Sequence, residues 1–116
     1  MRSIGIDIQE ISPFKTKNQK FLSKIFCESE RNFCVSKKFP EIHFAGKFAA
    51  KEAFNKAFFQ IYLKFIDLQH ICIENHESGQ PYIKIWGEKN MKRIGKKIVL
   101  SISHSGNFAV AVVVIK

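Results

Sequence analysis

The sequence lacks several features that mark whole classes of protein. Its three cysteines, Cys27, Cys34 and Cys72, are odd in number and form no C-x-x-C pair. This spacing argues against both a disulfide framework and a zinc knuckle. We therefore expect reduced, partly buried thiols, the usual state of intracellular cysteine. No G-x-S-x-G sequence is present, so a serine nucleophile on a strand-to-helix elbow is a poor fit.

Long hydrophobic stretches are also missing. The longest uninterrupted apolar run, Phe108 to Ile115, is far too short to span a bilayer. Asp7 and Glu10 interrupt the isoleucines near the N-terminus, which excludes a signal-peptide core there. These absences predict a cytoplasmic location. The chain has no internal repeat, low-complexity tract or linker, and its 116 residues suit one domain with a real core.

Acidic residues are scarce. Ten Asp and Glu stand against 19 Lys and Arg, which gives a formal net charge of +9. Such a surplus attracts nucleic acid, an anionic membrane, phosphorylated small molecules or an acidic protein, and charge alone does not choose among them. Hydrophobic residues make up 46% of the chain and include 12 phenylalanines, which argues against overall disorder.

The local patterns predict helices followed by hairpin-connected strands. Residues 3–8 alternate as a strand, with Ile4, Ile6 and Ile8 on one face and Asp7 on the other. A first helix is expected over 18–26, and a short second helix after an N-cap at Ser29. Pro40 is expected to close that region, and a long third helix to run from about His43 to Leu63. Further strands are expected at Ile71–Glu74, Tyr82–Trp86, Ile98–Ser103 and Phe108–Ile115, with a basic segment at Glu88–Lys97. This order is typical of an α+β domain.

The most informative single residue is Glu52, in the long helix. That helix is apolar on most sides, so it should be buried, and a buried carboxylate needs a cationic side chain or a metal as partner. Lys56 lies one turn along, and Asp7 offers a second carboxylate. Two converging carboxylates predict a hard-metal site that suits Mg²⁺ better than zinc. A structural Glu52–Lys56 pair and a solvent-facing Asp7 remain open alternatives.

Basic and hydroxyl side chains near these acids suit phosphate. Lys47, Lys51 and Lys56 share the long helix with Glu52; they either extend to solvent or form a phosphate clamp beside the metal. Ser103 and His104, where a strand runs into a turn, can also donate to a phosphate. The other histidines, His43, His70 and His76, are scattered and are expected to be surface or structural residues.

Five motifs together resemble a known family. They are Gly5-Ile-Asp-Ile-Gln-Glu-Ile11, Phe21-Leu-Ser-Lys-Ile-Phe26, Phe48-Ala-Ala-Lys-Glu-Ala53 with Lys56-Ala57, Ser78-Gly-Gln-Pro81 and Ser101-Ile-Ser-His-Ser105. In this order they resemble the small bacterial holo-[acyl-carrier-protein] synthases, which are 4′-phosphopantetheinyl transferases. The resemblance covers nearly the whole chain. It implies one transferase-type domain over residues 1–116, with an antiparallel sheet, a long buried helix and a homotrimer with active sites between subunits.

The resemblance also implies an activity. Family members transfer the 4′-phosphopantetheine arm of coenzyme A to a serine of apo acyl carrier protein, in fatty acid biosynthesis, and release adenosine 3′,5′-bisphosphate. Asp7 and Glu52 would hold Mg²⁺ with the CoA pyrophosphate, and Lys56 would contact the phosphate where charge develops. The remaining coenzyme A contacts would be Lys47, Lys51, Ser78, Gly79, Pro81, Ser103 and His104.

The chain departs from the family pattern at two places. Ser12 and Pro13 stand where the family usually carries a glutamate and an arginine, so docking of the acidic carrier protein must rely on other cations: Lys15, Lys20, Lys24 or Arg31. Lys47 stands where the family usually has arginine, and lysine cannot bind a phosphate through the bidentate hydrogen bonds that arginine makes.

Other points stay open. The base for the incoming serine is a metal-bound water, Glu30 or Glu52. A small nucleic-acid-binding module would explain the charge but not Asp7 and Glu52, and a metal-dependent phosphohydrolase would use the same groups with water as acceptor. Only the transferase interpretation accounts for all five motifs.

Overall fold

The computed structural model describes residues 2–87 and 97–116, so most of the predicted basic segment at Glu88–Lys97 lies outside the described residues. The elements in chain order are β1 (Ser3–Glu10), the 3₁₀ turn η1 (Ser12–Lys15), α1 (Gln19–Ile25), α2 (Glu28–Val35), α3 (Pro40–Tyr62), the 3₁₀ turn η2 (Leu68–His70), β2 (Ile71–Asn75), β3 (Pro81–Ile85), β4 (Ile98–Ser105) and β5 (Phe108–Ile115). This confirms the predicted α+β class. Within these residues, no helix combines the length and the apolar character needed to cross a membrane.

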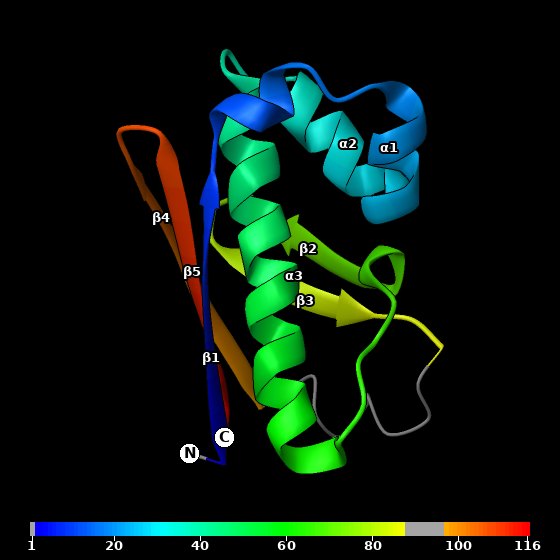
Figure 1. Cartoon of the computed structure of the whole chain (residues 1–116), viewed down its shortest axis with the longest axis vertical. Coiled ribbons are helices and arrows are strands. Elements are labelled where there is room, and N and C mark those ends of the chain that lie inside the picture. Colours follow the sequence, from blue (N-terminus) through cyan, green and yellow to red (C-terminus); the bar gives the residue numbers. More distant parts are fainter. Residues whose placement is uncertain (1, 88–96) are drawn as a thin grey trace.

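The strands of the described residues form two antiparallel sheets. One has three strands in the order β1-β5-β4, and the other is the β2-β3 hairpin. Helix α3 runs along the three-stranded sheet and also packs against β2, while α1 and α2 gather beside its N-terminal half (Figure 1). Because α3 lies between these elements, it is the scaffold on which side chains from both sheets meet.

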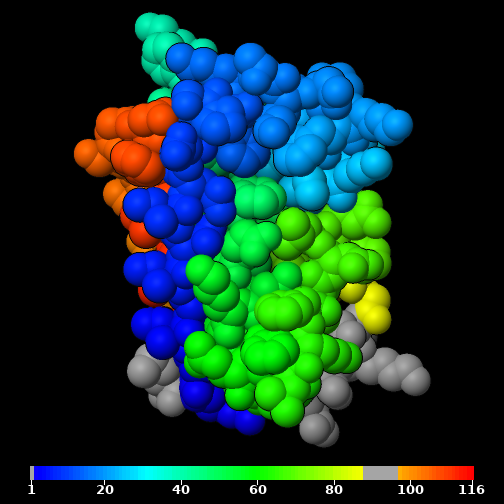
Figure 2. Space-filling view, viewed as in Figure 1, coloured from blue at the N-terminus to red at the C-terminus, as the bar shows by residue number. Residues whose placement is uncertain are grey.

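Close packing between β1 and α3 decides which face of the strand is buried. A Cβ added at Gly5 would lie 1.9 Å from the carbonyl oxygen of Ala53, so a side chain there would force helix and strand apart. The predicted alternation is present, but the isoleucine face points outward, with Ile6 61% exposed. Figure 2 shows β1 in blue at the surface beside α3 in green. Asp7 therefore lies on the face turned toward α3.

Two helix starts differ from the prediction. Pro40 begins α3 rather than closing the preceding region, because proline at the first helical position gives up only an N–H that has no intrahelical partner. Cys27, not Ser29, is the N-cap of α2, and its backbone N–H donates to Glu30 Oε1 at 2.8 Å. Strand β4 also continues to Ser105, two residues beyond its predicted end.

The prediction of three reduced cysteines is wrong for two of them. Cys27 and Cys72 form a disulfide across 45 residues of sequence, joining the start of α2 to β2. Their separation gave no sign of this pairing, because only the tertiary packing brings the two segments together. Cys34 is free and buried, and its burial raises the pKa of its thiol to about 12, which keeps it protonated and inert.

Candidate active site

The first part of the site is an acidic pair on β1 and α3. β1 is an edge strand of its sheet, so α3 can satisfy its outer backbone groups. Lys56 Nζ does so by donating to Ile6 O at 3.0 Å, and it also contacts Asp7 Oδ1 at 3.2 Å. Gln9 Nε2 donates to the other Asp7 oxygen at 2.6 Å. The Asp7 side chain is only 12% exposed, so the alternative of an ordinary solvent-facing aspartate is wrong.

Glu52 completes this acidic pair from α3. Its side chain is half-buried, and burial raises the pKa of its carboxyl group; the negative charge of Asp7 adds to the rise and Lys56 opposes it. The predicted convergence of the two carboxylates is therefore present, whereas Lys56 forms its ion pair with Asp7 rather than with Glu52. A carboxylate whose ionisation is disfavoured by burial and by a second carboxylate nearby fits a hard divalent cation, which would relieve the repulsion.

The second part is a cavity of about 330 Å³ beside the N-terminal half of α3. Five of the predicted coenzyme A contacts line it: Lys47, Gly79, Pro81, Ser103 and His104. Phe33, Lys37, His43 and Asn75 line it as well. His43 lies one turn before Lys47 on α3, so helical spacing could have placed it on the same face, whereas Lys37 reaches the cavity only through tertiary packing. His43 is thus a cavity residue and not simply a scattered surface histidine.

Lys47 reaches this cavity from a buried position. It is 4% exposed, and its Nζ donates to Ile73 O and to Asn75 Oδ1. Burial lowers the pKa of its ammonium group, and nearby negative charge, including Glu30 and Glu74, opposes the shift. The expectation that lysines of this helix extend to solvent is wrong for Lys47, which is held in place by β2.

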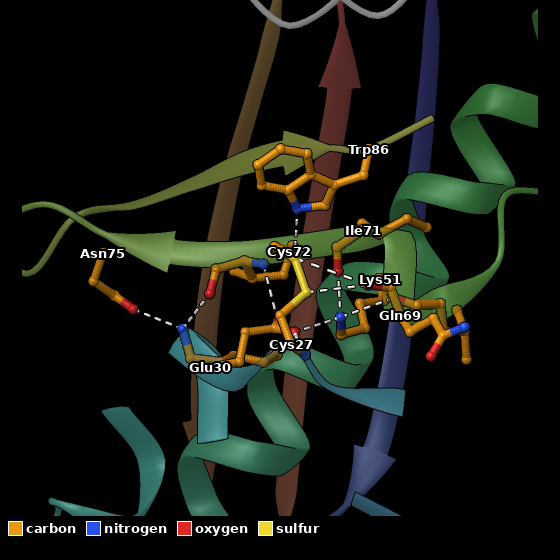
Figure 3. A network of polar contacts seen from close by, with 11 residues as sticks. Cys27, Glu30, Lys51, Gln69, Ile71, Cys72, Asn75 and Trp86 are labelled. Carbon is orange, nitrogen blue, oxygen red and sulfur yellow. Dashed lines mark hydrogen bonds and ion pairs between the residues drawn. A yellow bond between two sulfur atoms is a disulfide. The ribbon is translucent and has the colours of Figure 1, made fainter. Parts of the chain in front are cut away.

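Lys51 lies in the interior. It is fully buried, and its Nζ donates to Glu30 Oε1 at 2.7 Å, to Leu68 O at 2.9 Å and to Ile71 O. These partners use all three ammonium donors, so the geometry leaves Lys51 no donor for a coenzyme A phosphate (Figure 3). Burial lowers the pKa of Lys51 and Glu30 opposes the change.

Glu30 is equally committed to the fold. It is 1% exposed and accepts hydrogen bonds from Cys27 N, Lys51 Nζ and Ile73 N. Its candidacy as the base therefore has no geometric support. Glu30 also forms a compact group with the sulfur atoms of Cys27 and Cys72, but those sulfurs are joined to each other as a disulfide.

Comparison with known proteins identifies the family of this fold. The family model described as the 4′-phosphopantetheinyl transferase superfamily matches residues 3–113. The chain belongs to this superfamily. It is 36% identical over 112 residues to the holo-[acyl-carrier-protein] synthase of Protochlamydia amoebophila, covering 93% of this chain and 92% of that protein. With its Halothermothrix orenii counterpart it shares 39% identity over 125 residues, covering 98% and 96%.

Solved structures of holo-[acyl-carrier-protein] synthases share the transferase fold. The Helicobacter pylori enzyme in complex with coenzyme A has a TM-score of 0.78 at 33% identity, with 97% of this chain and 99% of that chain covered. The Bacillus anthracis enzyme, in complex with CoA (3′,5′-ADP), has a TM-score of 0.77 at 34% identity, with 98% and 95% covered. The chain is thus a member of the holo-[acyl-carrier-protein] synthase group of enzymes.

The two parts of the transferase site lie on different sides of α3. Lys47 and Lys56 are nine positions apart, or about two and a half turns, so they project from opposite sides of the helix. Lys47 accordingly contacts β2 and Lys56 contacts β1. Ser78, in the β2–β3 turn, is exposed, and its hydroxyl accepts from Gln80 N at 3.4 Å. One chain alone does not gather all the predicted contacts into a single cavity.

Proposed function

We propose that this chain transfers the 4′-phosphopantetheine group of coenzyme A to a serine of apo acyl carrier protein, with Mg²⁺, for fatty acid biosynthesis. The products are holo acyl carrier protein and adenosine 3′,5′-bisphosphate. The observation that carries the proposal is the convergence of Asp7, Glu52 and Lys56 at the free edge of β1. The named activity of the relatives and the coenzyme A complexes of two neighbours support it. The cytoplasm as its location remains a prediction.

The acidic pair and Lys56 have different roles at the reacting phosphate: the pair binds the metal, and Lys56 stabilises charge. Asp7 and Glu52 are the residues that would hold Mg²⁺, which supplies Lewis-acid stabilisation of the pyrophosphate when bound. Lys56 Nζ, fixed by Ile6 O and Asp7, places a positive charge beside the same phosphate. Because this ammonium is positioned before substrate arrives, it stabilises developing charge without reorganisation.

The cavity is the proposed location for the rest of coenzyme A. Its volume of about 330 Å³ lies at the small end of the range usual for ligand sites, roughly 300–1,000 Å³. Lys47 and His104 offer basic groups to phosphate, and Gly79, Pro81 and Ser103 line the wall. We do not extend the proposal to Lys51, whose ammonium is fully engaged by Glu30 and two backbone carbonyls.

A homotrimer with active sites between subunits belongs to the same proposal. The outer face of the three-stranded sheet exposes Ile4, Ile6, Ile8, Val99 and Phe108. Adjacent exposed apolar side chains of this kind mark an interaction surface. Contact between chains would also explain how the acidic pair and the cavity, on opposite sides of α3, serve one substrate.

The proposed protein substrate is acidic. The chain carries a formal net charge of +9, and α1 presents exposed Lys20 and Lys24 beside Phe21. Arg31 is anchored by its hydrogen bond to Ser23 Oγ at 2.6 Å. Such a basic face would steer an acidic carrier protein toward the site, in place of the arginine that Pro13 replaces.

The test is the mass of apo acyl carrier protein after incubation with this chain, coenzyme A and Mg²⁺. A gain of one phosphopantetheine that is lost on chelation of Mg²⁺ is the expected result. Cleavage of coenzyme A without a protein acceptor would instead establish the phosphohydrolase. Absence of both coenzyme A binding and transfer would overturn the proposal, and salt-sensitive binding to random DNA would then favour the nucleic-acid module.

A further inference from the structure

An aromatic ring at the cavity gathers three basic side chains. Phe33, on α2, has Lys37 Nζ 4.6 Å and Lys47 Nζ 4.5 Å from its ring centroid. The His43 ring meets it edge-on, with centroids 5.7 Å apart and planes at 80°. All four residues line the cavity with His104. Lys47 is the most strongly held, because it already donates to Ile73 O and Asn75 Oδ1. Within the part of the chain that the structure describes, the His43 side chain has no hydrogen bond that would occupy it in the same way.

The surroundings of His43 oppose its protonation in the free protein. Burial is the largest cause that lowers the pKa of its imidazole from 6.5, and the charges of Lys37, Lys47 and His104 lower it further. Among the described residues, Glu41 on the same helix alone acts in the other direction. These groups come from the α2–α3 connection, α3 and β4. The cavity therefore holds a neutral imidazole among cations when no anion is present, at neutral pH.

We propose that His43 is a binding residue for the terminal phosphate monoester of coenzyme A, and that it takes up a proton when this phosphate enters the cavity. The inference rests on the proposed function. The pyrophosphate is assigned to the acidic pair and Lys56, so the monoester at the other end of the nucleotide is the phosphate left for the cavity. An entering dianion offsets the positive charges of Lys37 and Lys47, and the imidazolium can donate a charge-assisted hydrogen bond to it.

The sign of the resulting pH dependence follows from linkage. His43 binds a proton more tightly in the complex than in the free protein, so coenzyme A binds more tightly as pH falls. The effect develops between the higher pKa of His43 in the complex and its lowered pKa in the free protein. Within that window one proton per ligand changes the association constant by up to about tenfold per pH unit.

The experiment is isothermal titration calorimetry of the full chain with coenzyme A, at about pH 6 and about pH 8. Each titration is run in two buffers of different ionisation enthalpy, which gives the number of protons taken up. His43→Gln should lose most of this uptake and bind coenzyme A on the order of tenfold more weakly than wild type at the lower pH. The two proteins should differ by less than about twofold at the higher pH, because the affinity gained from proton uptake is lost as pH rises.

Matched variants and ligands separate His43 from other titrating groups. His70→Gln changes an exposed histidine on η2 outside the cavity lining and should behave as wild type. His43→Lys carries a permanent charge, so it should retain affinity at both pH values without proton uptake. With 3′-dephospho-CoA, which lacks the monoester, wild type and His43→Gln should bind alike. Circular dichroism of each variant verifies that it is folded.

Three outcomes would overturn the inference. Equal proton uptake in wild type and His43→Gln would show that another group takes the proton, and loss of uptake only in His104→Gln would assign it to His104. Equal affinity of wild type and His43→Gln at the lower pH would remove His43 from the binding site. If transfer to acyl carrier protein succeeds in these cases, only this inference fails; if coenzyme A does not bind at all, the proposed function fails with it.

Discussion

At the scale of the residue, the Glu52 carboxylate is unfavourable for the stability of the fold but is required for the proposed metal site. Burial and the nearby charge of Asp7 raise the pKa of its carboxyl group, so the charged form is unfavourable in the metal-free protein. The cost is absent below the ordinary carboxyl value of about 4.3, where the group is protonated in both states, and it appears as pH rises through the raised pKa. A bound cation would remove this cost, which is why Glu52 is better explained by function than by stability.

We expect Glu52→Gln to abolish transfer while leaving the fold intact. Without Mg²⁺ at neutral pH, the variant should melt at the same temperature as wild type or higher, because it loses the repulsion from Asp7. The transfer rate should fall on the order of 10² or more, since a metal ligand supplies several kcal/mol of charge stabilisation. Thermal melts with and without Mg²⁺, with the mass assay of the carrier protein, measure both effects. A near-normal rate in Mg²⁺ would contradict the metal assignment.

Lys56 should act mainly on the chemical step. Its Nζ is held by Ile6 O and Asp7 Oδ1, and its position favours charge that develops on the phosphate. We expect Lys56→Ala to lower kcat by on the order of 10²-fold and to weaken coenzyme A binding much less. Single-turnover kinetics and a separate binding titration distinguish the two effects. Losses of equal size in both would make Lys56 a binding residue only.

At the scale of the element, β2 joins the start of α2 to the middle of α3. Cys72 is bonded to Cys27, Ile73 N donates to Glu30 Oε2 at 2.9 Å, and Asn75 accepts from Lys47 (Figure 3). The neighbouring Trp86 Nε1 contacts Cys72 Sγ at 3.3 Å. Because these contacts follow one another along β2, the strand holds the wall of the cavity in register with α3.

Reduction of the disulfide should therefore cost stability without unfolding this unit. Closing a loop of 45 residues is worth about 4 kcal/mol in the chain-entropy model, but the Glu30–Lys51 pair remains in the reduced protein. We expect denaturant midpoints to fall on addition of a dithiol reductant, whereas the double variant Cys27→Ser/Cys72→Ser should not respond to it. Alkylation of the unfolded, unreduced chain should label one thiol, Cys34. Labelling of three would contradict the disulfide.

The sequence predicted elements better than it predicted their connections. The bounds of Phe108–Ile115 were correct in full because a continuous apolar run rich in β-branched residues is a local signal, whereas the other predicted strands were displaced or extended at their ends. The Glu30–Lys51 pair was missed because its partners are 21 positions apart and each resembles an ordinary surface charge. The cavity was foreseen through Lys47 and His104, which belong to recognisable motifs. Lys37 was not, because only the packing beside Phe33 brings it there, and His43 was missed although it lies one turn before Lys47 on the predicted helix.

At the scale of the whole molecule, the outward apolar face of the sheet needs an explanation that one chain does not give. Val99 is 45% exposed on β4 and lies away from the acidic pair. We expect Val99→Lys to weaken self-association measured by light scattering, because burying an unpaired ammonium in an interface is costly. Val35→Lys, at a site 58% exposed on α2, is the matched control and should assemble normally. If light scattering shows wild type to be a monomer at working concentration, the trimer proposal is wrong.

Mixing two impaired variants tests whether one active site draws on two chains. Glu52→Gln damages the acidic pair and His104→Ala damages the cavity, and these lie on opposite sides of α3. If neighbouring subunits complete each site, mixed assemblies contain some sites with an intact Glu52 from one chain and an intact His104 from another. We expect transfer activity to reappear when the two variants are dissociated and reassembled together, above the sum of their separate rates. Activity equal to that sum would mean that each chain uses its own acidic pair with its own cavity, and substrate would then have to bridge around α3.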